Sequence, residues 1–220
     1  MEFAHRVIVL DEDSRMRLDH VRRAFAIGAH PDDVEVGAGG LVAKLAASGA
    51  AVTLQVASIP NRYAIRKAEA VRAAKHLGVR LVLPPEDGET RVEELAMHEL
   101  VARFEHELAA TDPELVILHQ ANDVHHDHHV VHRAAIAALR RSRADILVYA
   151  TRLPPGASPP PPTCVVDITG SIDRKLAAIA EHTSQFPPGF AEARRDVARV
   201  LGYSYGVAYA EVFEVLRITL

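Results

Sequence analysis

The stretch Ala24-Phe25-Ala26-Ile27-Gly28-Ala29-His30-Pro31-Asp32-Asp33 decides the fold that we expect for this chain. Its first half is an apolar run with the composition of a buried strand, and the polar residues begin where that strand would end. His30, Asp32 and Asp33 can each bind a metal ion or transfer a proton. The stretch therefore predicts a buried strand whose carboxyl end carries a chemical site.

A second polar stretch follows another apolar run in the same way. Leu115–His119 is typical of a buried strand, and His125-His126-Asp127-His128-His129 follows it closely. Five of the 13 histidines lie between His125 and His132, so they are concentrated at one point of the chain. This density indicates a second half of the same site.

Strand-like and helix-like segments alternate along the chain with short connections between them. We expect strands at residues 22–29, 51–58, 79–83, 114–119, 144–150, 164–168 and 208–218, and helices at 37–49, 65–77, 92–110, 128–141, 172–186 and 191–201. Such alternation is typical of a parallel sheet with helices on both faces, joined by right-handed crossovers. The expected fold is a single-domain α/β, Rossmann-like, doubly wound and mostly parallel sheet over residues 21–220, preceded by an N-terminal arm or edge strand in residues 1–20.

Composition excludes several classes of function. The chain of 220 residues is 49% hydrophobic and 25% charged, and its net charge of −4 gives no support for a nucleic-acid partner. Cys164 is the single cysteine, which excludes an intrachain disulfide and a Cys-rich zinc site and fits a reducing compartment. Charges interrupt every apolar run, and the first residues do not resemble a secretion signal, so we expect no membrane partner and a cytoplasmic location.

The two polar stretches should meet in space. Ligands bind outside the carboxyl ends of parallel strands, at the point where the strand order reverses. A catalytic zinc site needs about three His or carboxylate ligands and an open position for water. His30, Asp33 and His128 can supply those ligands, Asp32 can serve as general base, and His125 can donate a proton.

Asp127 could then fix the tautomer of a neighbouring imidazole. Together, these residues would form the active site of a hydrolase for an amide or ester. Spacing alone does not decide between Asp32 and Asp33 as ligand, nor among the histidines from His125 to His132.

Other interpretations compete with this one. An aspartate after a strand can simply cap the next helix, and a His-rich tract can be a solvated cluster. The glycines at 37, 39 and 40 do not form the Gly-x-Gly-x-x-Gly pattern of a dinucleotide loop. Two alternatives stay open: a non-haem iron(II) oxygenase, since two histidines and one carboxylate also suit iron, and a non-catalytic module that binds a metal or a sugar.

At these residues the chain resembles the LmbE-like, or PIG-L, family of N-acetylglucosamine deacetylases. The likeness rests on Ala29-His30-Pro31-Asp32-Asp33-Val34-Glu35 with the glycines after it, and on His125-His126-Asp127-His128 followed by His132. It extends to Ser184-Gln185-Phe186 and Tyr209-Ala210-Glu211 near the end of the chain. Two differences stand out: His126 replaces a proline, and the loop at residues 58–63 is short.

The resemblance implies a function and a role for each residue. The activity would be zinc-dependent hydrolysis of the acetamide of an N-acetylglucosamine-type sugar or conjugate, with iron(II) as an alternative metal and a homo-oligomer as an open alternative. His30, Asp33 and His128 would be metal ligands. Asp32 would be the general base, His125 would stabilise the oxyanion and protonate the amine, Asp127 would orient His125, and Arg66 would bind substrate.

Overall fold

The computed structural model describes residues 8–10, 18–85, 87–151 and 162–218. Its strands are β1 (Ile8–Leu10), β2 (Arg23–Gly28), β3 (Ala51–Val56), β4 (Arg80–Val82), β5 (Leu115–His119), β6 (Asp145–Tyr149), β7 (Cys164–Asp167) and β8 (Ala210–Arg217). Its α-helices are α1 (Asp33–Ala47), α2 (Tyr63–Leu77), α3 (Met97–Thr111), α4 (His126–Ala138), α5 (Ile172–Ala180) and α6 (Phe190–Tyr205). Short 3-10 turns occupy Leu18–His20, Val92–Glu94 and Leu139–Arg141.

The described strands form one sheet in the order β1-β7-β8-β6-β5-β2-β3-β4. All neighbouring strands are parallel except that β8 runs antiparallel to both β6 and β7. The chain passes from β2 outward to β3 and β4, and then returns to place β5 on the other side of β2. The prediction of a doubly wound, mostly parallel α/β sheet is therefore confirmed, and the strand order reverses between β2 and β5.

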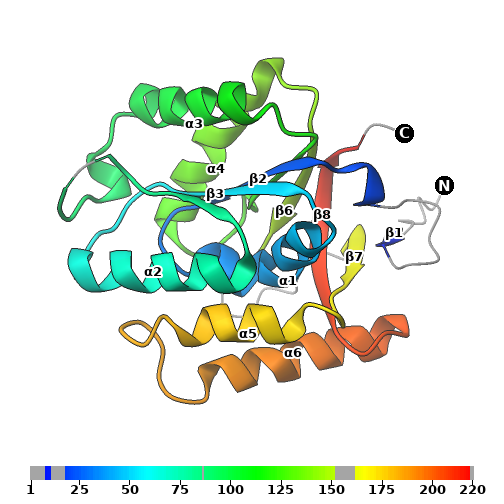
Figure 1. Cartoon of the computed structure of the whole chain (residues 1–220). Helices are drawn as coiled ribbons and strands as arrows, with labels where there is room; N and C mark the ends of the chain where they lie inside the picture. Colours follow the sequence, from blue (N-terminus) through cyan, green and yellow to red (C-terminus); the bar gives the residue numbers. More distant parts are fainter. Residues whose placement is uncertain (1–7, 11–17, 86, 152–161, 219–220) are drawn as a thin grey trace.

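Helices cover both faces of this sheet, because alternate side chains of each strand point to opposite sides. Phe25 and Ile27 of β2 pack in a core with residues of α3 and α4. Ala24 and Ala26 pack in a second core with residues of α1 and α5. Figure 1 shows α3 and α4 on one side of the sheet and α1, α2, α5 and α6 on the other.

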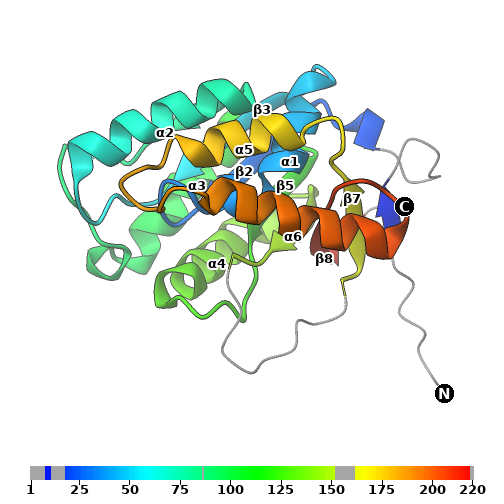
Figure 2. The ribbon, with the colours of Figure 1, turned by 90° about the horizontal axis from the view of Figure 1, so that it is seen from below.

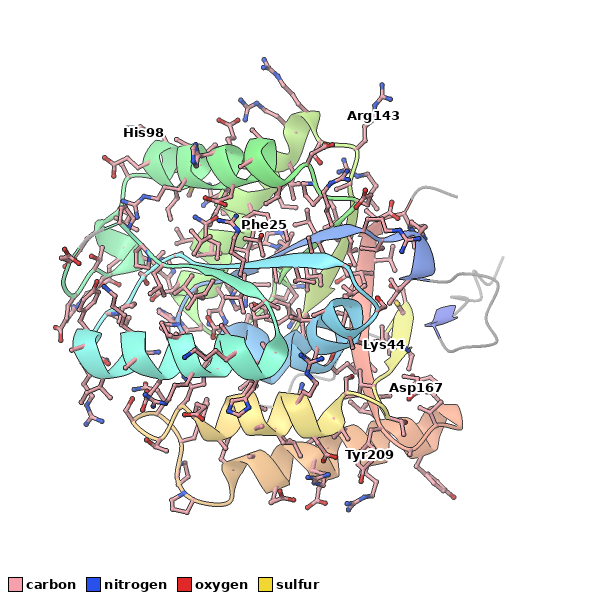
Figure 3. The ribbon with its side chains drawn as sticks, viewed as in Figure 1. Phe25, Lys44, His98, Arg143, Asp167 and Tyr209 are labelled. Atoms are coloured by element: carbon pink, nitrogen blue, oxygen red, sulfur yellow. The ribbon has the colours of Figure 1, made fainter. Side chains whose placement is uncertain are left out.

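Figure 2 shows the outer layer of the second face, where α5 lies between α6 and the pair α1 and α2. In Figure 3, Phe25 lies inside the molecule whereas His98 and Arg143 point to solvent. Lys44 of α1 and Asp167 at the end of β7 are close together in the same view, and Lys44 Nζ donates to the Asp167 carbonyl at 2.8 Å. None of the helices in the described part of the chain is long and apolar enough to span a bilayer.

All six α-helices begin or end at residues other than those predicted, and two of these differences have a clear packing cause. We expected a helix at residues 37–49, but α1 begins at Asp33, so the polar motif forms its first turn. The Gly-rich part is helical despite its low propensity because it packs closely: a Cβ on Gly37 would lie 2.1 Å from Tyr149 Cδ2, and one on Gly40 would lie 2.7 Å from Ile168 Cδ1. These glycines serve packing and form no nucleotide loop.

The helix expected at residues 172–186 is shorter than predicted. It ends as α5 at Ala180, and the chain then continues as a connection to α6. Glu69 of α2 holds this connection, since its carboxylate accepts hydrogen bonds from the Ser184 N–H at 2.8 Å and the Ser184 hydroxyl at 2.7 Å. This contact between distant parts of the chain overrides the local helical pattern.

The N-terminal end of the chain contributes to one edge of the sheet, where β1 pairs with β7. Residues 1–7 and 11–17 lie outside the described part, so the division into an arm at 1–20 and a domain at 21–220 stays a prediction. The proline-rich residues 152–161 also lie outside it.

Candidate active site

The two polar stretches meet because their strands are neighbours. Ala24 and Ala26 of β2 are in register with Leu115 and Ile117 of β5, so the loops that follow both strands leave the same edge of the sheet side by side. This edge contains the reversal of strand order described above. The topology therefore explains why groups almost 100 residues apart share one site.

The proposed metal ligands lie together in this site. The ligating atoms of His30, Asp33 and His128 are within 4.8 Å of one another, and all three residues are buried. Asp33 Oδ1 is 3.2 Å from His128 Nε2, and Asp33 Oδ2 is 3.7 Å from His30 Nδ1. Two imidazoles and one carboxylate form a donor set that suits zinc or iron(II), so the residues present fit a divalent cation.

Two carboxylates bind the far sides of the histidine rings. Asp123 Oδ1 lies 3.1 Å from His128 Nδ1, and Asp127 Oδ2 lies 2.8 Å from His30 Nε2. Each contact leaves the opposite ring nitrogen facing Asp33, as in metal sites where an outer carboxylate fixes the tautomer of the ligand.

The hydrogen bonds of Asp127 differ from those that we expected. The prediction was that Asp127 orients His125, but its carboxylate binds His30. The Asp127 contact to His125 comes instead from its backbone N–H, which donates to Nδ1 at 3.3 Å. The reason is the position of the residue in the first turn of α4, which directs the side chain toward the end of β2.

Charges within the cluster complement one another. Burial opposes ionisation of Asp33. The neighbouring imidazoles of His119, His128 and His30 nevertheless hold the pKa of Asp33 well below its usual range. Burial also disfavours a charged His128, but hydrogen bonds with Asp123 and Asp33 raise its pKa to about 10. These hydrogen bonds favour the protonated form of His128 in the metal-free protein, and a metal would displace that proton.

Asp32 occupies a strained position between Pro31 and the start of α1. Its φ of 107° lies in the left-handed region, which non-glycine residues rarely adopt, and its side chain does not cap the helix. Burial, together with repulsion from Asp33, raises the pKa of Asp32 to about 7, against the opposing charge of Arg66. A buried carboxyl with a pKa near neutrality has the property that a general base requires.

Arg66 of α2 contacts the same residue. Its Nη2 donates to the Pro31 carbonyl at 3.1 Å and lies 3.4 Å from Asp32 Oδ2. The structure therefore places Arg66 beside the general-base candidate, with only 4% of its surface exposed.

His125 lies at the open side of the cluster. It is exposed, and its ring centroid is 5.2 Å from that of His30 and 4.8 Å from that of His128. Because Nδ1 accepts the Asp127 N–H, the ring proton belongs on Nε2, which is free to donate. Partial desolvation of the ring by its neighbours, together with the nearby imidazoles, lowers the pKa of His125. His126 is exposed as the first residue of α4, and the ring contacts with the cluster are those of His125.

Sequence reasoning missed three buried residues around the ligands. His119 is fully buried; its Nε2 accepts the Ala29 N–H at 3.0 Å and lies 3.3 Å from Asp33 Oδ2. Its ring stacks on His128 at 3.9 Å, and the Tyr149 hydroxyl lies 3.3 Å away. Asp123 is the third. The sequence did contain a signal for these three residues, namely their positions in the chain. His119 and Tyr149 are the last residues of β5 and β6, and Asp123 lies two residues before His125.

Comparison with known proteins places these residues in a family context. A model of the PIG-L family, described as GlcNAc-PI de-N-acetylase, matches residues 25–139, a span that contains both polar stretches. The uncharacterized deacetylase YaiS of Escherichia coli (strain K12) is 29% identical over 152 residues, which are 65% of this chain and 81% of YaiS.

Solved structures share the fold over nearly the whole chain. The N,N'-diacetylchitobiose deacetylase of Pyrococcus horikoshii is 24% identical, with a TM-score of 0.73 over 90% of this chain and 85% of that one. GalB, the 4-carboxy-2-hydroxymuconate hydratase of Pseudomonas putida KT2440, is 20% identical, with a TM-score of 0.76 over 90% of this chain and 98% of that one. Since one fold serves two reactions in these proteins, the reaction must be argued from the site and the family.

Proposed function

The chain belongs to the PIG-L family of GlcNAc-PI de-N-acetylases and is an amide hydrolase of the deacetylase class; on this basis we propose that it is a zinc-dependent N-deacetylase of an N-acetylglucosamine-type sugar or conjugate. The products would be a free amine and acetate. One observation carries the proposal: the buried His30–Asp33–His128 cluster lies beside a carboxyl whose pKa is raised to about 7. YaiS and the Pyrococcus enzyme, both named as deacetylases, support the same class of reaction.

The metal centre would consist of His30, Asp33 and His128, with Asp127 and Asp123 fixing the two rings. A divalent cation held there supplies Lewis acidity, which lowers the pKa of water and polarises a carbonyl group. Zinc is the metal that we propose, and iron(II) suits the same donors.

Side chains of the protein would accept and donate the protons of the reaction. Asp32 would take the proton of the attacking water, and Arg66 would hold its carboxylate in place through the contact at 3.4 Å. His125 would donate a hydrogen bond from Nε2 to the oxyanion. In its doubly protonated form it would also give a proton to the leaving nitrogen, which departs as the amine while His125 returns to the neutral form. The open side at His125 is where the acetamide would enter.

The substrate and location follow the same proposal. We expect a small N-acetylated sugar or conjugate, no nucleic acid and no membrane partner. The net charge of −4 and the single cysteine support this expectation and a cytoplasmic location.

An activity screen tests the proposed function. Protein loaded with zinc or iron(II) is incubated with N-acetylglucosamine and its conjugates, and both amine and acetate are measured. We expect equal amounts of the two products, loss of activity on chelation, and recovery on return of the metal. Oxygen consumption without acetate release would favour an oxygenase, and sugar binding without turnover would favour a binding module; either outcome contradicts the proposal.

A further inference from the structure

A small pocket lies between α6, the start of β8 and the second turn of α1. Its cavity volume is about 60 Å³, and it is open to solvent on one side. Its lining combines apolar side chains, among them Val36, Val197 and Leu201, with three charged ones. Figure 2 shows α6 passing in front of β8 in this region. The pocket borders Gly37, one helical turn after Asp33, and its lining includes none of His30, Asp33 and His128.

Two of the three charged groups in this pocket satisfy each other. Lys175 Nζ lies 2.5 Å from Glu211 Oε1 and also donates to the Val36 carbonyl at 2.8 Å. The two Glu211 oxygens accept the backbone N–H groups of Gly40 and Leu41 at 2.8 Å each. The Lys175–Glu211 ion pair therefore has no net charge, and its hydrogen bonds hold α1 against β8.

Arg194 is the charged group that remains. Its guanidinium forms no hydrogen bond or ion pair within the described part of the chain, and its Nε is buried without a partner. Burial lowers the pKa of Arg194, and the nearest compensation is the charge of Glu211, which already binds Lys175. An arginine nevertheless stays protonated at neutral pH. The pocket thus presents a half-buried positive charge, which has no hydrogen-bond partner among the described residues, beside the apolar side chains of Val197 and Leu201.

We propose that this pocket binds a small organic monoanion, a carboxylate of the size of acetate, with its charge on Arg194 and its short apolar tail against Val197 and Leu201. A planar guanidinium matches a carboxylate through paired hydrogen bonds. The volume limits the ligand to a few non-hydrogen atoms beyond the charged group. The site does not depend on the proposed deacetylase function, although acetate is also a product of that reaction.

Titration of the full-length protein with acetate tests the proposal. Binding is measured by calorimetry or by the NMR signal of labelled acetate, with metal-loaded and chelator-treated protein and at constant ionic strength in chloride. We expect saturable binding in both forms, weakened about tenfold or more in Arg194→Gln. Arg199→Gln is the matched control, because Arg199 lies on the same helix, is exposed, and pairs with Asp196 at 2.7 Å. Acetamide, which has the same shape but no charge, should not compete.

Several results would overturn the proposal. Equal acetate binding in Arg194→Gln and the wild type, competition by acetamide or chloride, or binding that disappears with the metal would each place the anion elsewhere or make the effect unspecific. Arg194→Lys, which keeps the charge, should retain part of the affinity and serves if the glutamine variant does not fold. No sugar substrate is present, so failure of the deacetylase assay would leave this result unchanged.

Discussion

Replacement of Asp123 by asparagine should weaken metal binding at the His30–Asp33–His128 cluster without unfolding the protein. Both oxygens of this buried carboxylate accept hydrogen bonds from donors. Oδ1 lies 3.1 Å from His128 Nδ1 and 3.0 Å from the His125 N, and Oδ2 lies 2.8 Å from the Thr151 hydroxyl and 3.2 Å from the Thr151 N. An asparagine must point its NH₂ group at one of these two pairs, so donor faces donor whichever way the amide turns.

The expected loss follows from the role of Asp123 behind a metal ligand. Removal of such an outer hydrogen bond costs about 10- to 100-fold in metal affinity, which corresponds to about 1.4–2.7 kcal/mol. Competition between the protein and a chromogenic chelator for zinc measures the affinity directly. Asp112→Asn is the matched control, since Asp112 is exposed and precedes the amino end of β5, at the opposite edge of the sheet.

Folding is checked by circular dichroism and by thermal denaturation. Thr151→Val, which removes one donor to Oδ2, should give a smaller loss in the same direction. A folded Asp123→Asn protein that binds zinc with an affinity within about twofold of the wild type would refute the reasoning. The hydrogen bond between Asp123 and His128 would then contribute nothing to the metal affinity.

Three further predictions concern groups in and around the site. Asp32→Asn should reduce amine release at least about 100-fold with metal still bound. Because the pKa of Asp32 is raised to about 7, the contribution of this carboxyl to stability is complete below about pH 4 and is lost as the pH rises through 7. The metal-free Asp32→Asn variant should therefore melt at a higher temperature than the wild type at pH 8, and at the same temperature at pH 4. Lys175→Met should destabilise the protein by about 3–5 kcal/mol in urea denaturation, because Glu211 would stay buried without its cation, and a second change, Glu211→Gln, should restore part of the loss. Burial raises the pKa of Cys164 to about 12, so a thiol reagent at pH 8 should label the denatured and not the native protein.

Each of these has a contradicting outcome. Full turnover in Asp32→Asn would remove the proposed base. A Lys175→Met protein as stable as the wild type would show that the Glu211 charge is solvated. Rapid labelling of native Cys164 would mean that β7 opens readily.

The amino-acid sequence alone determined the strand ends that carry chemistry. The apolar runs before His30 and before the second histidine stretch are local patterns, and parallel strands place their carboxyl ends at one edge. From this, the meeting of the two polar stretches could be predicted, as could the parallel sheet with helices on both faces. The choice of His30, Asp33 and His128 as ligands followed from the resemblance to the family. The structure brings these residues to one cluster.

Only the tertiary structure decided which groups surround the ligands. The partner of His30 is Asp127, 97 residues away, whereas the resemblance had implied that Asp127 orients His125. The buried His119, to which the sequence assigned no role, stacks on His128. The close packing of α1 against β6 was likewise decided by the tertiary structure, since the Tyr149 ring lies where a Cβ of Gly37 would be. Periodicity reports which face of an element is buried, but hydrogen-bond partners are chosen by packing between elements distant in the chain.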